Sequence, residues 1–248
     1  MPDILSPPLV WPALGTLTVT PHHSLFHANA VMQATGSCVW NGGSAQVQGW
    51  LNLRVPKTAP AELEAPELSL QRYARELGVD APLAGMMTAA SMNSLRFQVI
   101  LNEQMALACV VTAGIQNARR SGDPCDDDFS HQQLTQAGTI NIALICNAAF
   151  APAARIEALM VATEAKTAAC YDLRMKSPVS GAPATGTGTD AICLLSGNSE
   201  LNALEYCGKH TLMGEWIGRA TYAAVRESVA TCLNLLDSIS GEQPDSIA

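Results

Sequence analysis

A single stretch organises the chain: Ala184-Thr185-Gly186-Thr187-Gly188-Thr189-Asp190-Ala191, which runs directly into the apolar segment Ile192-Cys193-Leu194-Leu195. Glycine permits positive φ and close approach to the backbone, and threonine adds a hydroxyl that donates, accepts or attacks. The pattern therefore predicts a polar loop at the mouth of a buried strand, where Asp190 and main-chain N–H groups surround a ligand. Taken alone, the stretch favours a simpler interpretation, a threonine-rich turn before a core strand.

The composition predicts a large core and few charged contacts. The 248 residues are 48% hydrophobic and 15% charged, which suits one large domain and argues against extended disorder. We expect one domain over residues 1–248, with an irregular lead-in at 1–13 and a flexible tail at 241–248. The formal net charge is −8, with 14 Lys and Arg spread thinly, so we expect neither a nucleic-acid nor a membrane partner.

The cysteine and histidine patterns give little sign of metal or disulfide chemistry. None of the eight cysteines forms a Cys-x-x-Cys pair, and most lie in apolar runs where cysteine acts as a small hydrophobe. The chain opens without a signal-peptide pattern, so we expect a cytoplasmic protein with reduced thiols. His22, His23 and His27 lack a favourable ligand spacing. We therefore assign no metal ligand, and the metal requirement and the role of these histidines stay open.

Strand-like patterns dominate the first half of the chain, and helical spacing appears in three places. Strands are predicted at 14–20, 25–32, 47–55, 84–90, 96–101, 107–112, 138–145 and 192–195. Helices are predicted at 67–77, 153–172 and 212–239. The fold class that follows is α/β of the mixed α+β kind, with layered, largely antiparallel or mixed sheets covered by the two long helices.

The two long helices carry candidate inward faces. For the helix at 153–172, the spacing predicts an inward stripe of Ile156, Leu159, Met160, Thr163, Thr167 and Cys170. For the helix at 212–239, the predicted stripe includes Trp216, Ile217, Ala220, Ala224 and Leu235. Glu215 is placed to pair with Arg219 one turn later.

Charged residues near these helices have two interpretations each. Glu164 and Lys166 are two positions apart, so they point to different sides of a helix. Burial of either would suit it to proton transfer, whereas a position at the rim would let it extend to water. Lys209 and His210 stand at a helix start, where the macrodipole disfavours cations. That position suits contact with an anion or a neutral imidazole base, and it equally suits a hydrated loop.

Five motifs in a fixed order carry a resemblance to a known family. They are Thr112-Ala113-Gly114…Asn117-Ala118, Gly138-Thr139-Ile140-Asn141, Thr163-Glu164-Ala165-Lys166-Thr167, the stretch 184–191, and Gly208-Lys209-His210-Thr211…Gly214-Glu215. Together with the turn Asn41-Gly42-Gly43, they resemble the adenosylcobinamide amidohydrolase family of corrinoid salvage. The resemblance runs from about residue 16 to the C-terminal helix and is strongest between 112 and 215.

The resemblance implies a hydrolase. Members of this family cleave the amide that joins a propionyl side chain of the corrin ring to aminopropanol, giving adenosylcobyric acid. The corrinoid is then the substrate, and no cofactor is implied. The oligomeric state is open, with a homo-oligomer among the possibilities. Two alternatives are a non-catalytic corrinoid-binding protein and a self-processing amidase or acyltransferase of the threonine type.

The motifs supply the site residues that amide hydrolysis requires. The catalytic candidates are Glu164, Lys166, Thr187, Asp190 and His210. The substrate-binding candidates are Thr112, Asn117, Thr139, Asn141, Thr185, Gly186, Gly188, Thr189, Lys209 and Glu215. A threonine hydroxyl or a directly activated water is the nucleophile, and Lys166, Glu164 or His210 is the base. Direct water attack is slightly favoured because no Gly-x-Ser-x-Gly signature is present.

A wide cleft for a corrin needs apolar walls, for which several large side chains are available. They are Trp40, Trp50, Met86, Met87, Met92 and Trp216. Because such residues are more often core than ligand-facing, we expect most of them to lie in the core.

Overall fold

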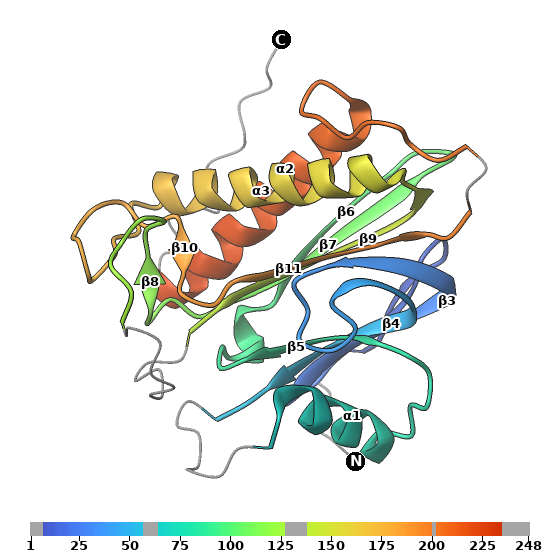
Figure 1. Ribbon diagram of the computed structural model, residues 1–248, viewed down its shortest axis with the longest axis horizontal. Helices are drawn as coiled ribbons and strands as arrows, with labels where there is room; N and C mark the ends of the chain where they lie inside the picture. Colours follow the sequence, from blue (N-terminus) through green and yellow to red (C-terminus); the bar gives the residue numbers. More distant parts are fainter. Residues whose placement is uncertain (1–6, 57–63, 127–137, 200–201, 235–248) are drawn as a thin grey trace.

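The structure, a computed structural model, describes residues 7–56, 64–126, 138–199 and 202–234 (Figure 1). Part of the expected lead-in, the expected tail at 241–248 and the helical positions 235–239 with Leu235 lie outside the described residues. Within the described ranges, no helix combines the length and apolar character needed to cross a membrane.

The described residues form eleven strands and three α-helices. The strands are β1 (Leu9–Trp11), β2 (Gly15–Val19), β3 (His23–Gly36), β4 (Gly43–Arg54), β5 (Ala84–Thr88), β6 (Arg96–Leu101), β7 (Ala106–Ala113), β8 (Ala118–Arg119), β9 (Ile140–Ala149), β10 (Gly186–Thr187) and β11 (Ala191–Gly197). The helices are α1 (Pro66–Glu76), α2 (Pro152–Asp172) and α3 (Leu212–Leu233), with a short 3-10 turn, η1 (Met92–Ser94). The predicted mixed α+β class is confirmed.

A mixed sheet of nine strands organises the molecule. Seven strands follow the order β1-β2-β3-β11-β9-β7-β6, while β4 pairs with β3 and with β5. β11 runs parallel to β9, and β4 runs parallel to β5. The other neighbours in this sheet are antiparallel. The parallel pair brings the starts of β9 and β11 side by side at one end of the sheet.

Strand β3 makes the sheet curl. Its first part pairs with β2 and its last part pairs with β11, while β4 pairs with both parts. The register is interrupted between His27 and Met32. The curl brings β5 toward β9, where Asn141 Nδ2 of β9 donates to the main-chain oxygen of Met87 at 2.8 Å. This approach closes one wall of the pocket described below.

The sheet has an apolar core on each face. Along β9, Ile142 and Leu144 belong to the core beneath α2 and α3. Their neighbours Ala143 and Ile145 belong to the core that includes residues of β2 to β5. Because β9 is covered on both faces, its sequence is almost continuously apolar, as a buried strand requires. Figure 1 shows α2 and α3 on one side of the sheet and α1 beside β4 and β5 on the other.

Local signals explain where the long helices begin and end. Pro152 occupies the first turn of α2, a position that tolerates proline. Thr211 caps α3 by accepting a hydrogen bond from Gly214 N at 3.1 Å. Asn234 adopts a left-handed conformation with φ of 56°, which ends α3 at Leu233. The sequence predicted that the helix includes Asn234. This prediction is wrong, because Asn234 is not helical.

The predicted inward stripe of α2 is wrong in part. Ile156 and Met160 are 53% and 58% exposed. The buried positions of α2 are Ala154, Ala158, Val161, Ala162, Lys166, Ala169 and Cys170. The small alanines let α2 pack closely against the sheet and α3. The stripe was predicted in the wrong orientation because apolar residues stand on several sides of α2. Within the predicted stripe of α3, Trp216, Ile217, Ala220 and Ala224 are buried as expected.

Candidate active site

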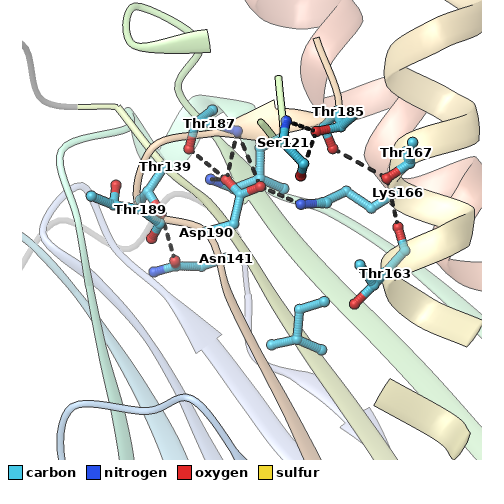
Figure 2. A network of polar contacts seen from close by, with 12 residues as sticks. Ser121, Thr139, Asn141, Thr163, Lys166, Thr167, Thr185, Thr187, Thr189 and Asp190 are labelled. Atoms are coloured by element: carbon cyan, nitrogen blue, oxygen red, sulfur yellow. Dashed lines mark hydrogen bonds and ion pairs between the residues drawn. The ribbon is translucent and has the colours of Figure 1, made fainter. Parts of the chain in front are cut away.

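A buried ion pair joins α2 to the start of β11. Lys166 Nζ contacts Asp190 Oδ2, and the two side chains are only 10% and 11% exposed. Figure 2 shows Lys166 extending from the helix to the carboxylate of Asp190. Asp190 stands directly before β11, and Ile140 opens the neighbouring parallel strand β9. The pair therefore lies where two parallel strands begin.

The carboxylate of Asp190 also holds the preceding bend and the start of β9. Its Oδ1 accepts hydrogen bonds from Ile140 N at 3.0 Å, Thr187 N at 3.1 Å and Thr187 Oγ1 at 2.5 Å. Charge-assisted hydrogen bonds of this kind are stronger than those between neutral groups. One side chain thus fixes the loop, the strand end and the lysine relative to one another.

Two glycines of the motifs are required by close packing. A Cβ atom on Gly186 would overlap both Asp190 Oδ2 and Lys166 Nζ. A Cβ atom on Gly138 would lie 2.6 Å from Asn117 Oδ1 and 2.7 Å from the oxygen of Gly114. Such contacts are shorter than real Cβ atoms show. The glycines therefore let the ion pair and the Asn117 side chain approach the main chain.

The threonines connect the two loops that precede β9 and β11. Thr189 Oγ1 donates to the oxygen of Gly138 at 2.8 Å, and Thr139 Oγ1 donates back to the oxygen of Thr189 at 2.8 Å. Thr185 instead faces the 118–121 segment, where its hydroxyl accepts from Ser121 N at 2.9 Å. Figure 2 shows these hydroxyls on either side of Asp190.

A second polar cluster lies beneath this loop and is fully buried. Asn52 Nδ2 of β4 donates to Thr112 Oγ1 of β7 at 2.9 Å. Asn141 Nδ2 of β9 donates to Asn52 Oδ1 at 2.9 Å. The three residues are at most 1% exposed. Buried polar groups satisfied in this way hold a single arrangement of the strands that carry them.

A pocket of about 280 Å³ connects the two clusters. One wall is largely apolar and includes Val39, Val55, Met86, Met87 and Ala89. The other wall is polar and includes Asn117, Thr139, Asn141, Thr189 and Asp190. An apolar pocket with a few convergent polar groups is the usual form of a small-molecule site.

Several predicted site residues lie away from this pocket. Glu164 pairs with Lys209 at the surface, with side chains 53% and 69% exposed. Glu215 pairs with Arg219 at 3.0 Å, as the sequence predicts, and His210 is exposed. None of these five residues lines the pocket. The structure thus brings Lys166, Thr187 and Asp190 together and puts Glu164, Lys209, His210 and Glu215 elsewhere.

The remaining predicted binding residues surround the pocket at different depths. Asn117, Thr139, Asn141 and Thr189 line it. Thr112 lies beneath Asn141 through Asn52. Gly188 and Asn117 line a neighbouring hollow of about 490 Å³. Of the expected large apolar residues, Trp50, Met86, Met92 and Trp216 are buried, and Met86 and Met87 also contribute to the pocket wall.

Asn52 is a polar residue of this site that the sequence prediction missed, and the wall residues Val39, Val55 and Ala89 were missed as well. Asn52 lies inside a predicted strand and belongs to none of the motifs that marked the other site residues. The available signal was a polar side chain among the apolar residues Trp50, Leu51 and Leu53. A buried amide in such a setting requires hydrogen-bond partners from other strands.

Cys170 and His23 do not supply a nucleophile or a base to the pocket. Burial raises the pKa of the Cys170 thiol, close to Lys166, to about 12, which disfavours a reactive thiolate. His23 lies instead between β3 and α1, where its Nδ1 is 2.9 Å from Tyr73 Oη. Burial, followed by the charge of His22, lowers the pKa of His23 to about 4. Among the described residues, no three His, Cys, Asp or Glu side chains gather as metal ligands.

Comparisons with known proteins show the family to which this chain belongs. The sequence model described as adenosylcobinamide amidohydrolase matches residues 17–236. The chain belongs to the adenosylcobinamide amidohydrolase family. The enzymes of this family hydrolyse a carbon–nitrogen amide bond, and the matched range contains Lys166, Asp190 and all the residues that line the pocket.

Two relatives are similar to this family member over much of its length. The adenosylcobinamide amidohydrolase of Methanosarcina mazei is 31% identical over 194 residues, which cover 75% of this chain and 84% of the relative. Uncharacterized protein MJ1613 of Methanocaldococcus jannaschii is 34% identical over 161 residues, which cover 59% of this chain and 62% of the relative. The second alignment thus spans less than two thirds of that relative.

One solved structure has a slight overall likeness. The PH0078 protein of Pyrococcus horikoshii OT3 is 10% identical with a TM-score of 0.36, over 94% of this chain and 82% of that chain. We therefore draw no conclusion about the fold or the site from this structure.

Proposed function

We propose that this family member hydrolyses the amide between the corrin propionyl arm and aminopropanol in adenosylcobinamide, giving adenosylcobyric acid. The support is family membership together with the name of the Methanosarcina relative. The observation that carries the proposal is the buried Lys166–Asp190 pair on the polar side of the pocket. An exposed or missing pair would have favoured a corrinoid-binding protein without catalysis.

The proposed nucleophile is a water molecule held near Asp190. Asp190 lines the pocket, whereas Thr187, its hydrogen-bond partner at 2.5 Å, does not. Water therefore reaches the carboxylate more directly than a substrate carbonyl reaches the threonine hydroxyl. A positioned acid–base group of this kind typically contributes about 10²- to 10⁴-fold to the rate. Lys166 acts through Asp190 by fixing the orientation of the carboxylate.

The proposed step balances as an ordinary amide hydrolysis. The water oxygen forms a bond to the carbonyl carbon as the carbon–oxygen π electrons move to the carbonyl oxygen, and a water proton passes to Asp190. The carbon–oxygen double bond then re-forms and the carbon–nitrogen bond breaks, with its electron pair going to nitrogen, which takes the proton from Asp190. The products are a carboxylic acid on the corrin and a free amino alcohol.

The size of the pocket suits the arm of the substrate and excludes the ring. A corrin macrocycle is too large for about 280 Å³, so we infer that only the amide arm enters. Val39, which lines the pocket and is 50% exposed, lies where the ring would rest. Methylene groups of the arm would then contact the apolar wall.

A product assay tests the proposal. Purified protein is incubated with adenosylcobinamide in water enriched in oxygen-18, and the products are identified by mass spectrometry. The proposal predicts free aminopropanol and adenosylcobyric acid with one oxygen-18 in its new carboxylate. Absence of both products, with the corrinoid retained on the protein, would support the non-catalytic alternative. A denaturing gel of the same sample tests the self-processing alternative, which predicts two fragments.

A further inference from the structure

The orientation of the Asn141 side chain is fixed by groups that accept hydrogen bonds. Both hydrogens of its Nδ2 are used, one by Asn52 Oδ1 at 2.9 Å and one by the oxygen of Met87 at 2.8 Å. A main-chain oxygen has no hydrogen to donate. A reversed amide would therefore place the Asn141 oxygen against that of Met87, with no hydrogen between them. Asn141 is thus held with its Oδ1 on the side of Thr139.

Two acceptors on the polar wall of the pocket are short of donors. Thr139 has one hydroxyl hydrogen for two acceptors, the oxygen of Thr189 at 2.8 Å and Asn141 Oδ1 at 3.1 Å. When the hydrogen serves the shorter contact, Asn141 Oδ1 lacks a donor. Asn117 Oδ1, from another residue of the same wall, has no hydrogen-bond partner among the described residues. Buried acceptors without donors are costly, so this wall favours a ligand that brings N–H groups.

Asn52 supplies one of the two contacts that hold the Asn141 amide in this orientation. It is fully buried on β4, donates to Thr112 Oγ1 at 2.9 Å and accepts from Asn141 Nδ2. It does not line the pocket itself. Its contact with Asn141 therefore acts on a ligand through the Asn141 amide alone.

We propose that this pocket holds the amine side of the scissile amide, that Asn141 Oδ1 accepts the amide N–H, and that Asn52 is a positioning residue that holds this orientation together with the main-chain oxygen of Met87. The inference rests on the proposed function and names the part of the substrate that the pocket recognises. Asn141 Oδ1 is an acceptor and repels a carbonyl oxygen, so the acyl oxygen lies away from Asn141. The bond to Asn141 leaves the nitrogen lone pair directed elsewhere, free to receive the proton when the carbon–nitrogen bond breaks.

The test compares two substrates that differ in one atom. They are adenosylcobinamide and its ester analogue, in which oxygen replaces the amide nitrogen and the N–H is lost. The variant Asn52→Leu keeps the approximate volume and removes the contact with Asn141. We expect kcat/KM for the amide to fall about 10- to 100-fold, as loss of a buried hydrogen bond would produce. We expect kcat/KM for the ester to change less than about threefold, because the ester has no N–H to lose.

Two further variants separate positioning from general damage to the core. Asn52→Asp keeps an oxygen toward Asn141 Nδ2, so we expect it to recover a preference for the amide. Ser228→Ala removes a buried hydrogen bond to the oxygen of Ser94, which is 2.6 Å long in a region that does not line the pocket. We expect this variant to lose stability and to keep the wild-type ratio of amide to ester kcat/KM.

The outcomes are distinguishable. An equal fall for both substrates in Asn52→Leu would assign Asn52 a merely structural role and overturn the inference. Should that variant fail to fold, wild-type protein with an N-methylated amide tests the contact between the amide N–H and Asn141. We expect kcat/KM for this substrate to be about tenfold lower, or more, than for the natural amide. Equal kcat/KM for the N-methylated and natural amides would also overturn the inference. Wild-type protein that cleaves neither amide nor ester would refute the proposed function itself.

Discussion

Two ion pairs that involve α2 differ sharply although their helical residues are two positions apart. Lys166 contacts Asp190 in a nearly closed environment, whereas Glu164 contacts Lys209 in solvent. The buried carboxylate accepts further hydrogen bonds from Ile140 and Thr187. The side chains of the exposed pair have water as an alternative partner. Exposed pairs typically contribute about 0–1 kcal/mol, whereas breaking a buried pair costs about 3–5 kcal/mol.

The comparison teaches that position around the helix decides the role of a charge. Two residues correspond to a rotation of about 200° on an α-helix, so these side chains must leave α2 on opposite sides. Lys166 extends from α2 to Asp190, directly before β11, whereas Glu164 contacts Lys209 in solvent. The predictions below test whether this difference in position is also a difference in function.

Replacement of Asp190 should have the largest effect on activity. Asp190→Asn keeps the size of the side chain and removes the charge, so we expect turnover to fall about 10³-fold, as for loss of an acid–base group. Amine release measured by mass spectrometry gives the rate, and circular dichroism establishes that the variant folds. Wild-type turnover in the folded variant would remove Asp190 from the mechanism.

Replacement of Lys166 should reduce both stability and activity. Lys166→Met retains the aliphatic length and leaves Asp190 buried without its cationic partner, at an expected cost of about 3–5 kcal/mol in the free energy of unfolding. We expect turnover to fall less than in Asp190→Asn, because Lys166 acts through the carboxylate. Urea denaturation and amine release measure the two effects. An unchanged free energy of unfolding would contradict the buried character of the pair.

Replacement of Gly186 tests the close packing of the pair against the main chain. The Cβ atom of Gly186→Ala overlaps Asp190 and Lys166, so we expect the pair to separate and stability to fall by about 1–3 kcal/mol. Gly181→Ala offers a control in an open position, because no atom lies within 4 Å of its Cβ. That control carries its own strain from a positive φ of 70°. A loss of activity limited to Gly186→Ala would support the packing argument, and equal losses would contradict it.

His23 offers for comparison a buried titratable group that has no ion-pair partner among the residues that the structure describes. Its pKa in the folded state, about 4, lies below the ordinary value of 6.5. Between these pH values the unfolded chain binds the proton and the folded protein does not, so stability falls as the pH is lowered from 6.5 toward 4. Urea denaturation at several pH values should show a smaller fall in His23→Gln than in wild type. Parallel curves for the two proteins would exclude His23 as the cause.

Replacement of Glu164 should have the smallest effect. Glu164→Gln breaks an exposed contact, so we expect the free energy of unfolding to change by about 0.5 kcal/mol or less and turnover to change less than about twofold. Amine release and urea denaturation are again the measurements. A loss as large as that of Lys166→Met would show that the exposed pair contributes to the site.

The sequence anticipated much of the fold because local periodicity is strong in this chain. The strand at 96–101 and the start of the helix at 212 agree with β6 and α3. The orientation of α2 was missed because apolar residues such as Ile156 and Met160 stand on its exposed side. The parallel pairing of β9 with β11 was also out of reach, since it depends on contacts between segments far apart in the chain.

The site was anticipated where a motif contains the contact. Thr187 and Asp190 are three residues apart and share a hydrogen bond, so the stretch 184–191 contained its own geometry. Asn52 lies 89 positions from its partner Asn141. No local pattern indicates such a contact, and only the curl of the sheet brings the two side chains together.

One measurement tests the central claim most directly: initial rates of aminopropanol release from adenosylcobinamide by wild type, Asp190→Asn and Glu164→Gln under the same conditions. The account predicts similar rates for wild type and Glu164→Gln, and a rate reduced about 10³-fold for folded Asp190→Asn. Equal rates for wild type and Asp190→Asn, or an equal loss in both variants, would contradict it.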